Sequence, residues 1–82
     1  MIVVLFFGRM ADIAGEKRVE VESPPAGDWL FALRDRWLGA AIADGRVAAG
    51  GIHMSLNRIV VRDDALVADG DEVAFFSVFS GG

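Results

Sequence analysis

The sequence contains no cysteine, and this absence removes several ways of building and using a small protein. Neither a disulfide framework nor a thiolate metal site can hold the fold, and no side-chain thiol is available for sulfur chemistry. Basic residues are also few: the 82 residues include 8 lysines and arginines against 12 aspartates and glutamates, for a net charge of −4. This balance argues against a nucleic-acid partner, whose phosphate backbone needs a basic face.

The chain also lacks a segment that would direct it to a membrane. The apolar N-terminus, Met1–Phe7, has no basic region before it and no small-residue cleavage site after it, so it is not typical of a signal peptide. No apolar run approaches the roughly 18 residues that span a bilayer. We therefore expect a cytoplasmic protein with no membrane partner.

A hydrophobic core is what the composition does provide. The hydrophobic fraction of 54% is enough to build a core, and disorder is not expected. We expect residues 1–82 to form a single domain, with Ser77–Gly82 as an extended C-terminal tail.

Five short segments have the composition of strands, and Val19–Glu22 also shows the alternation of a half-buried one. The predicted strands are Ile2–Phe7, Val19–Glu22, His53–Leu56, Ile59–Arg62 and Glu72–Val78. One helix is predicted between the second and third strands. The last strand can pair parallel beside the first. The predicted fold is therefore α+β: a β-grasp with a mixed sheet of four or five strands, covered on one face by a helix.

The predicted helix runs over Trp29–Leu38. Asp28 is expected to cap its N-terminus, and Gly39 can end it, with a further turn over Ala40–Ala43 before Asp44-Gly45. Its apolar stripe consists of Trp29, Leu30, Leu33 and Trp37. A single helical turn is also predicted over Arg9–Ala14.

Several strands are apolar on both faces, although one helix covers only one face. Adjacent residues of a strand point to opposite faces. The adjacent apolar pairs are Phe6-Phe7, Val60-Val61 and Phe75-Phe76. One member of each pair must therefore lie on the outer face, where it forms either a docking patch for a partner or a surface that Ala40–Gly51 folds over. Phe79, in the tail, favours docking because it has little core to enter.

The chain ends in Gly81-Gly82, which leaves a free α-carboxylate with no side chain beside it. Without Cβ atoms, such a segment can enter a channel too narrow for any other residue. Extended, Ser77–Gly82 spans roughly 20 Å. One interpretation is a tail delivered into the active site of another protein, and the other is an ordinary frayed terminus. A carboxylate becomes reactive only when it is activated, and adenylation by ATP is one route.

No catalytic set is apparent within the chain. The single histidine, His53, lies in a predicted strand without an acidic companion, which favours a structural or surface role. The acidic pair Asp63-Asp64 and the segment Asp69–Glu72 lack the spacing of an EF-hand loop and are interpreted as solvated turns. We therefore expect no metal and no cofactor bound by this chain.

Three segments resemble the family of molybdopterin synthase small subunits. They are Met1–Gly8, Leu56–Arg58 and Asp69–Phe76, the last of which leads to the terminal Gly81-Gly82. The resemblance covers both ends of the chain, and the closing motif is its most specific part. It implies a ubiquitin-like β-grasp sulfur carrier, a subunit whose active site is provided by a large subunit.

In that family, an E1-like activating enzyme uses ATP to adenylate the terminal glycine, here Gly82. Sulfur from a donor then converts it to a thiocarboxylate. The tail enters the large synthase subunit, which uses the sulfur to build the dithiolene of molybdopterin, and the resemblance suggests that the two subunits form a heterotetramer. It also implies that Phe7, Val60 and Phe76 contact the large subunit. Family members commonly carry prolines just before the last residues, whereas this chain has Ser77–Ser80 there.

Other functions fit the same residues. The same chemistry could serve a carrier for thiazole synthesis or another sulfur pathway, or a ubiquitin-like modifier that ends in an isopeptide bond. A plain interaction domain, or a homodimer formed through the outer face, would also explain the apolar pairs.

Overall fold

Residues 1–77 are described by the computed structural model of the chain, and their main feature is a five-stranded sheet. From edge to edge, the strand order is β2-β1-β7-β4-β5. The bounds are Ile2–Phe6 for β1, Arg18–Val21 for β2, His53–Leu56 for β4, Ile59–Val61 for β5 and Glu72–Phe76 for β7. All five predicted strands are present.

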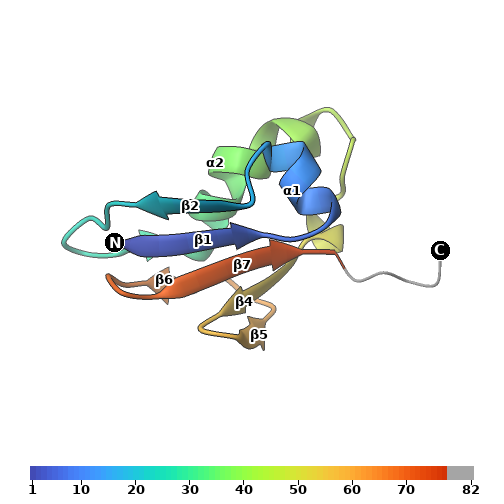
Figure 1. Cartoon of the computed structure of the whole chain (residues 1–82). Helices are drawn as coiled ribbons and strands as arrows, with labels where there is room; N and C mark the ends of the chain where they lie inside the picture. The colour runs from blue at the N-terminus through green and yellow to red at the C-terminus, as the bar shows by residue number, and fades with distance from the viewer. Residues whose placement is uncertain (78–82) are drawn as a thin grey trace.

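The sheet is mixed because the last strand, β7, runs parallel to the first, β1, with Phe6 beside Phe75. The other neighbours are antiparallel. Two helices, α1 (Arg9–Ala14) and α2 (Leu30–Ala43), lie on one side of the sheet (Figure 1). A 3-10 turn, η1 (Ala49–Gly51), precedes β4. This arrangement confirms the predicted α+β β-grasp.

The core lies between the sheet and the two helices. Alternation along β1 sends Ile2, Val4 and Phe6 into it, and all three are buried. The Phe6 ring stacks on Phe75, with 5.7 Å between the centroids, and meets Trp37 of α2 edge-on at 5.6 Å. Fully burying a side chain such as Val, Leu or Phe stabilises the fold by about 1.5–3 kcal/mol, so this layer supplies much of the stability.

The predicted break at Gly39 is wrong, because α2 continues through it to Ala43, and the further turn predicted over Ala40–Ala43 belongs to the same helix. Gly39 is not among the residues with positive φ, so its backbone does not adopt the left-handed conformation that ends many helices. A glycine inside a helix costs about 1 kcal/mol relative to alanine. Burial of Leu38 and Ala41 in the core offsets that cost and keeps the last turns helical.

The predicted start of α2 is also wrong. The helix begins at Leu30, and no side chain of its N-cap residue, Trp29, makes a capping hydrogen bond. Asp28 and Trp29 instead form a short strand, β3 (Asp28–Trp29), which pairs with β6 (Leu66–Val67) in a separate two-stranded sheet. Trp29 therefore leaves the predicted apolar stripe and is 54% exposed.

The first N–H groups of α2 are satisfied by a distant segment. The Phe31 N–H donates to Asp64 Oδ1 at 2.9 Å, and the Leu30 N–H donates to the Ala65 carbonyl at 2.9 Å. The chain that follows β5 is thereby fastened to the helix N-terminus. Asp64, which is distant from the helix in the sequence, therefore performs the N-capping role that we predicted for Asp28.

Candidate functional site

The face of the sheet away from the helices, here called the outer face, is organised in rows across the strands. One row consists of Arg18 at the β2 edge, followed by Leu5, Ala74, Ser55 and Val60. The next row, toward the end of β7, consists of Phe7, Phe76 and His53, where the Phe7 N–H donates to the Phe75 carbonyl and His53 is paired with Phe76. At the other end of β7, Glu72 occupies the corresponding position. The outer face is therefore apolar at the end where β7 finishes.

The structure resolves which member of each adjacent apolar pair faces outward. Phe7 and Val60 are 53% and 58% exposed, and Phe76 is half-buried. Their neighbours Phe6 and Phe75 are in the core. The three predicted partner-binding side chains Phe7, Val60 and Phe76 therefore lie on one face, in two adjacent rows.

His53 belongs to the same face, which sequence reasoning did not anticipate. Its ring stacks on Phe76, with 5.9 Å between centroids and 27° between planes. Ser55 and Ala74 beside them are small and buried, so they form a flat floor between the larger side chains. This placement was predictable from the sequence of β4, because residues two apart in a strand point to the same face and His53 therefore lies on the face of Ser55.

The alternative in which Ala40–Gly51 folds over the outer face is wrong. The first part of this segment is the end of α2, and Val47 is buried in the core on the helix side. Phe7 and Val60 remain more than half exposed. Within residues 1–77, the apolar rows are thus not covered by this segment.

The end of β7 determines where the predicted tail begins. The strand ends at Phe76, and because β7 is parallel to β1, this point lies at the end of the sheet opposite to the N-terminus (Figure 1). The row of Phe7, Phe76 and His53 is the last outer-face row before the tail. The predicted residues Phe79, Gly81 and Gly82 lie outside the described residues. The predicted last strand, Glu72–Val78, was too long, because β7 ends at Phe76 and Ser77 is not part of a strand.

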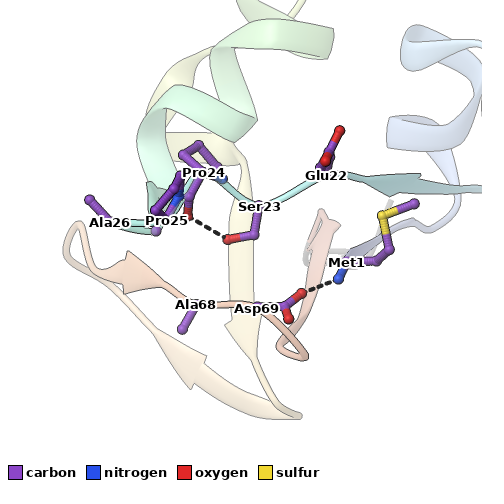
Figure 2. Close-up of a pocket in the computed structure, with 9 residues that line it drawn as sticks. Met1, Glu22, Ser23, Pro24, Pro25, Ala26, Ala68 and Asp69 are labelled. Atoms are coloured by element: carbon purple, nitrogen blue, oxygen red, sulfur yellow. Dashed lines mark hydrogen bonds and ion pairs between the residues drawn. The ribbon is translucent and has the colours of Figure 1, made fainter.

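A hollow of about 550 Å³ lies at the other end of the sheet (Figure 2). Two pairs of its polar groups contact each other: the Met1 α-ammonium forms an ion pair with Asp69, and the Ser23 hydroxyl donates to the Pro24 carbonyl at 3.1 Å. Neither pair offers an activated nucleophile or a general base. This hollow joins the start of β1 to the turn before β7 and is not the candidate site.

Two acidic side chains of the predicted turns, Asp64 and Asp69, serve the fold. Asp64 accepts from the α2 N-terminus, and Asp69 pairs with the Met1 amine. Among residues 1–77, no three His, Asp or Glu side chains come close enough to hold a metal ion. Neither α1 nor α2 has the length and apolar character needed to cross a bilayer.

Asp71 is part of a hydrogen-bond network at the start of β7. Its carboxylate accepts from Asn57 Nδ2 at 3.0 Å and from the Ala68 N–H at 2.8 Å. These two donors, the Asn57 amide first, hold the pKa of Asp71 below its usual value. The network fastens the β4–β5 turn to β7 and is structural.

The fold is shared with solved structures of small archaeal modifier proteins. SAMP1 from Haloferax volcanii matches with a TM-score of 0.71 and 26% identity, over 99% of this chain and 98% of that one. Small archaeal modifier protein 1 from Methanosarcina acetivorans matches with a TM-score of 0.67 and 20% identity, over 99% and 95% of the two chains. The second likeness shows the fold alone.

The sequence is 37% identical to the molybdopterin synthase sulfur carrier subunit of Escherichia coli (strain K12), over the full length of both chains. This relative confirms the resemblance to molybdopterin synthase small subunits. The model of the ThiS family matches residues 4–82, which is nearly the whole sequence. The chain therefore belongs to the ThiS family.

Proposed function

We propose that this protein is the sulfur carrier subunit of a molybdopterin synthase. The observation that best supports the proposal is the 37% identity, over the full length of both chains, to the E. coli sulfur carrier subunit. The outer face fits this role, because its two apolar rows reach the end of β7, where the tail begins. A partner docked there would receive the tail directly.

The reactive position in this proposal is Gly82, with Gly81 keeping the approach free of side chains. A Gly82 carboxylate oxygen attacks the α-phosphorus of ATP on an E1-like activating enzyme, and pyrophosphate leaves. Hydrosulfide, HS⁻, supplied by the sulfur donor then attacks the acyl carbon of the adenylate, AMP leaves, and the product is a C-terminal thiocarboxylate. ATP is bound by the activating enzyme and not by this chain, which contributes no catalytic side chain of its own.

The partner in this proposal is the large subunit of the synthase. Phe7, Val60 and Phe76 form the contact surface, and Phe79 extends it into the tail. The thiocarboxylate enters the large-subunit active site and gives its sulfur to the dithiolene of molybdopterin. The proposed assembly is a heterotetramer in the cytoplasm, where ATP for activation is available.

Intact mass spectrometry tests the chemistry. The protein is produced together with its activating enzyme and sulfur donor, in cells that make molybdenum cofactor. We expect a species heavier by the replacement of one oxygen by one sulfur, with the change confined to the C-terminal peptide. Finding only the carboxylate form under these conditions would contradict the proposal.

Deletion of Gly82 provides the matched variant. It shifts the terminal carboxylate by one residue but leaves residues 1–77 intact, so we expect loss of the sulfur-containing species with unchanged thermal unfolding. Normal cofactor synthesis by the deletion variant would contradict a role for Gly82.

The likeness to SAMP1 of Haloferax volcanii supports a second candidate, a protein modifier. Activation would be the same, but a lysine amine would displace AMP and leave an isopeptide bond. Conjugates that end in Gly82, found by mass spectrometry of tryptic peptides, would favour the modifier; a thiocarboxylate without conjugates would favour the carrier.

A further inference from the structure

The two edges of the five-stranded sheet differ in how they are protected. The β2 edge carries Arg18 and Glu20, which form an ion pair at 3.3 Å, and Glu22 follows. Charged residues on an edge strand discourage pairing with another chain. The opposite edge, β5, consists only of β-branched apolar residues, and its Ile59 is 69% exposed. The β5 edge therefore lacks the protection that β2 has.

The backbone of β5 is free on its outer side. Ile59–Val61 pairs with β4, and no further backbone hydrogen bond of these residues is found in the part of the chain that the structure describes. After β5 the chain turns away to the N-terminus of α2, where Ala65 accepts from the Leu30 N–H. An edge strand whose N–H and C=O groups are unpaired is a template for an added strand.

A groove of about 450 Å³ runs beside this edge, between β5 and α2. Its floor is apolar and consists of Phe31 from α2, Ile52 just before β4, Met54 in β4 and Val61 in β5. An extended segment lying along β5 would place alternate side chains in this groove.

The groove is lined by basic side chains and by no acidic one. Arg34 and Arg62 line it, together with His53, although the whole chain has more acidic than basic residues. Arg34 is held in place, since it stacks over Phe31 at 4.4 Å and pairs with Asp35 at 2.8 Å. Asp63, next to Arg62, does not line the groove. The charge here is complementary to an acidic partner.

A second copy of this chain fits the edge poorly. Antiparallel pairing of two β5 strands would bring Arg58 of one copy beside Arg62 of the other, because these residues flank the strand. Like charges placed directly opposite each other destabilise a strand pair.

We propose that the β5 edge binds an extended acidic segment of a partner protein as an additional strand, with its apolar side chains in the groove and its carboxylates on Arg34 and Arg62. Val60 links this edge to the outer face, so one partner can use both surfaces. The inference does not rest on the proposed sulfur chemistry, because it needs neither the tail nor its activation.

The test uses a short fluorescein-labelled peptide whose groove-facing alternate positions carry valine in the middle and glutamate at both ends, with serine at the positions between them, and a matched peptide with lysine in place of glutamate. We expect saturable binding of the acidic peptide only, measured by fluorescence anisotropy. Arg62→Glu should weaken the binding of the acidic peptide by roughly tenfold or more, because it places a carboxylate beside the carboxylates of the peptide. Arg36→Glu is the matched control: it makes the same charge change on α2, outside the groove, and should leave affinity within about twofold.

Backbone pairing is tested separately from charge. An acidic peptide N-methylated at alternate residues keeps its charges but cannot donate to a strand, so its binding should be lost. Amide exchange at Ile59–Val61 should slow when the unmethylated peptide binds. Equal binding of the methylated peptide, absence of saturable binding, or protection at β2 instead of β5 would each overturn the proposal. A dimer that forms through β5 in sedimentation and excludes the peptide would also overturn it, in favour of a second copy.

Discussion

The Asn57 side chain makes two hydrogen bonds that join the β4–β5 turn to the start of β7. With Arg58 it forms the turn between β4 and β5, and both residues have positive φ, 51° and 69°. Its Nδ2 donates to Asp71 Oδ1 at 3.0 Å, and its Oδ1 accepts from the Glu72 N–H at 2.9 Å. Asparagine is one of the few residues other than glycine that readily adopts this conformation. One residue thus sets the turn and fastens it to β7.

We expect both Asn57→Gly and Asn57→Ala to lower the free energy of unfolding. Glycine keeps the positive φ but loses the two side-chain hydrogen bonds, at a cost of about 1–3 kcal/mol. Alanine should cost about 1 kcal/mol more, because its Cβ disfavours the left-handed conformation. Urea denaturation measures both values. If Asn57→Gly is as stable as the parent protein, the amide contacts contribute nothing.

Asp71 should make stability depend on acid pH. Its pKa is lowered in the folded protein, first by the Asn57 amide and then by the Ala68 N–H. Its contribution is therefore present above the unfolded pKa, about 3.9, and is lost as pH falls through the folded value. Stability measured from pH 5 downward should fall less steeply in Asp71→Asn. Asn57→Gly should flatten the curve in the same way, and an unchanged slope in both variants would contradict this.

At the scale of elements, the sequence predicts the strands that have a recognisable hydrophobic pattern. It misses the elements that depend on contacts between residues far apart in the sequence. The continuous apolar run Ile2–Phe7 and the alternation of Val19–Glu22 were sufficient to find β1 and β2. Strands β3 and β6 have two residues each, too short to show a period, and form only because they meet each other. The predicted start of α2 was wrong for a similar reason, since Asp64 caps the helix from a distant part of the chain.

Gly39 and Gly27 provide a matched pair of glycine substitutions. A Cβ on Gly39 would lie 3.5 Å from the Asp35 Cβ, an ordinary contact, so Gly39→Ala should stabilise the protein by about 1 kcal/mol through helix propensity. A Cβ on Gly27 would lie 2.7 Å from the Val67 carbonyl oxygen, and Gly27 has a φ of +82°, so Gly27→Ala should destabilise. Thermal unfolding of both variants checks the prediction; a loss of stability in Gly39→Ala would show that α2 needs the glycine.

At the scale of the whole molecule, two surfaces meet at Val60: the apolar outer face and the basic groove beside β5. Adjacent phenylalanines predicted the outer face, because a strand cannot bury both. The groove was not predictable, since Arg34 and Arg62 come together only through the packing of α2 against the sheet. The chemistry proposed for Gly82 depends on the family and on the sequence, because that residue lies outside the described part.

Phe75 and Phe76 are adjacent but lie on opposite faces, so they separate docking from stability. Phe75 is fully buried, whereas Phe76 is half-buried on the outer face. We expect Phe76→Arg to weaken binding to the large synthase subunit by roughly thirtyfold or more, the effect of losing a central aromatic contact of about 2 kcal/mol. Its thermal unfolding should change little.

Phe75→Arg, the matched variant, should unfold the protein because it buries an unpaired charge. Calorimetric titration with the large subunit and thermal melts measure the two effects. If Phe76→Arg unfolds as Phe75→Arg does, Phe76 serves the fold, and Phe7 and Val60 must then account for docking on their own.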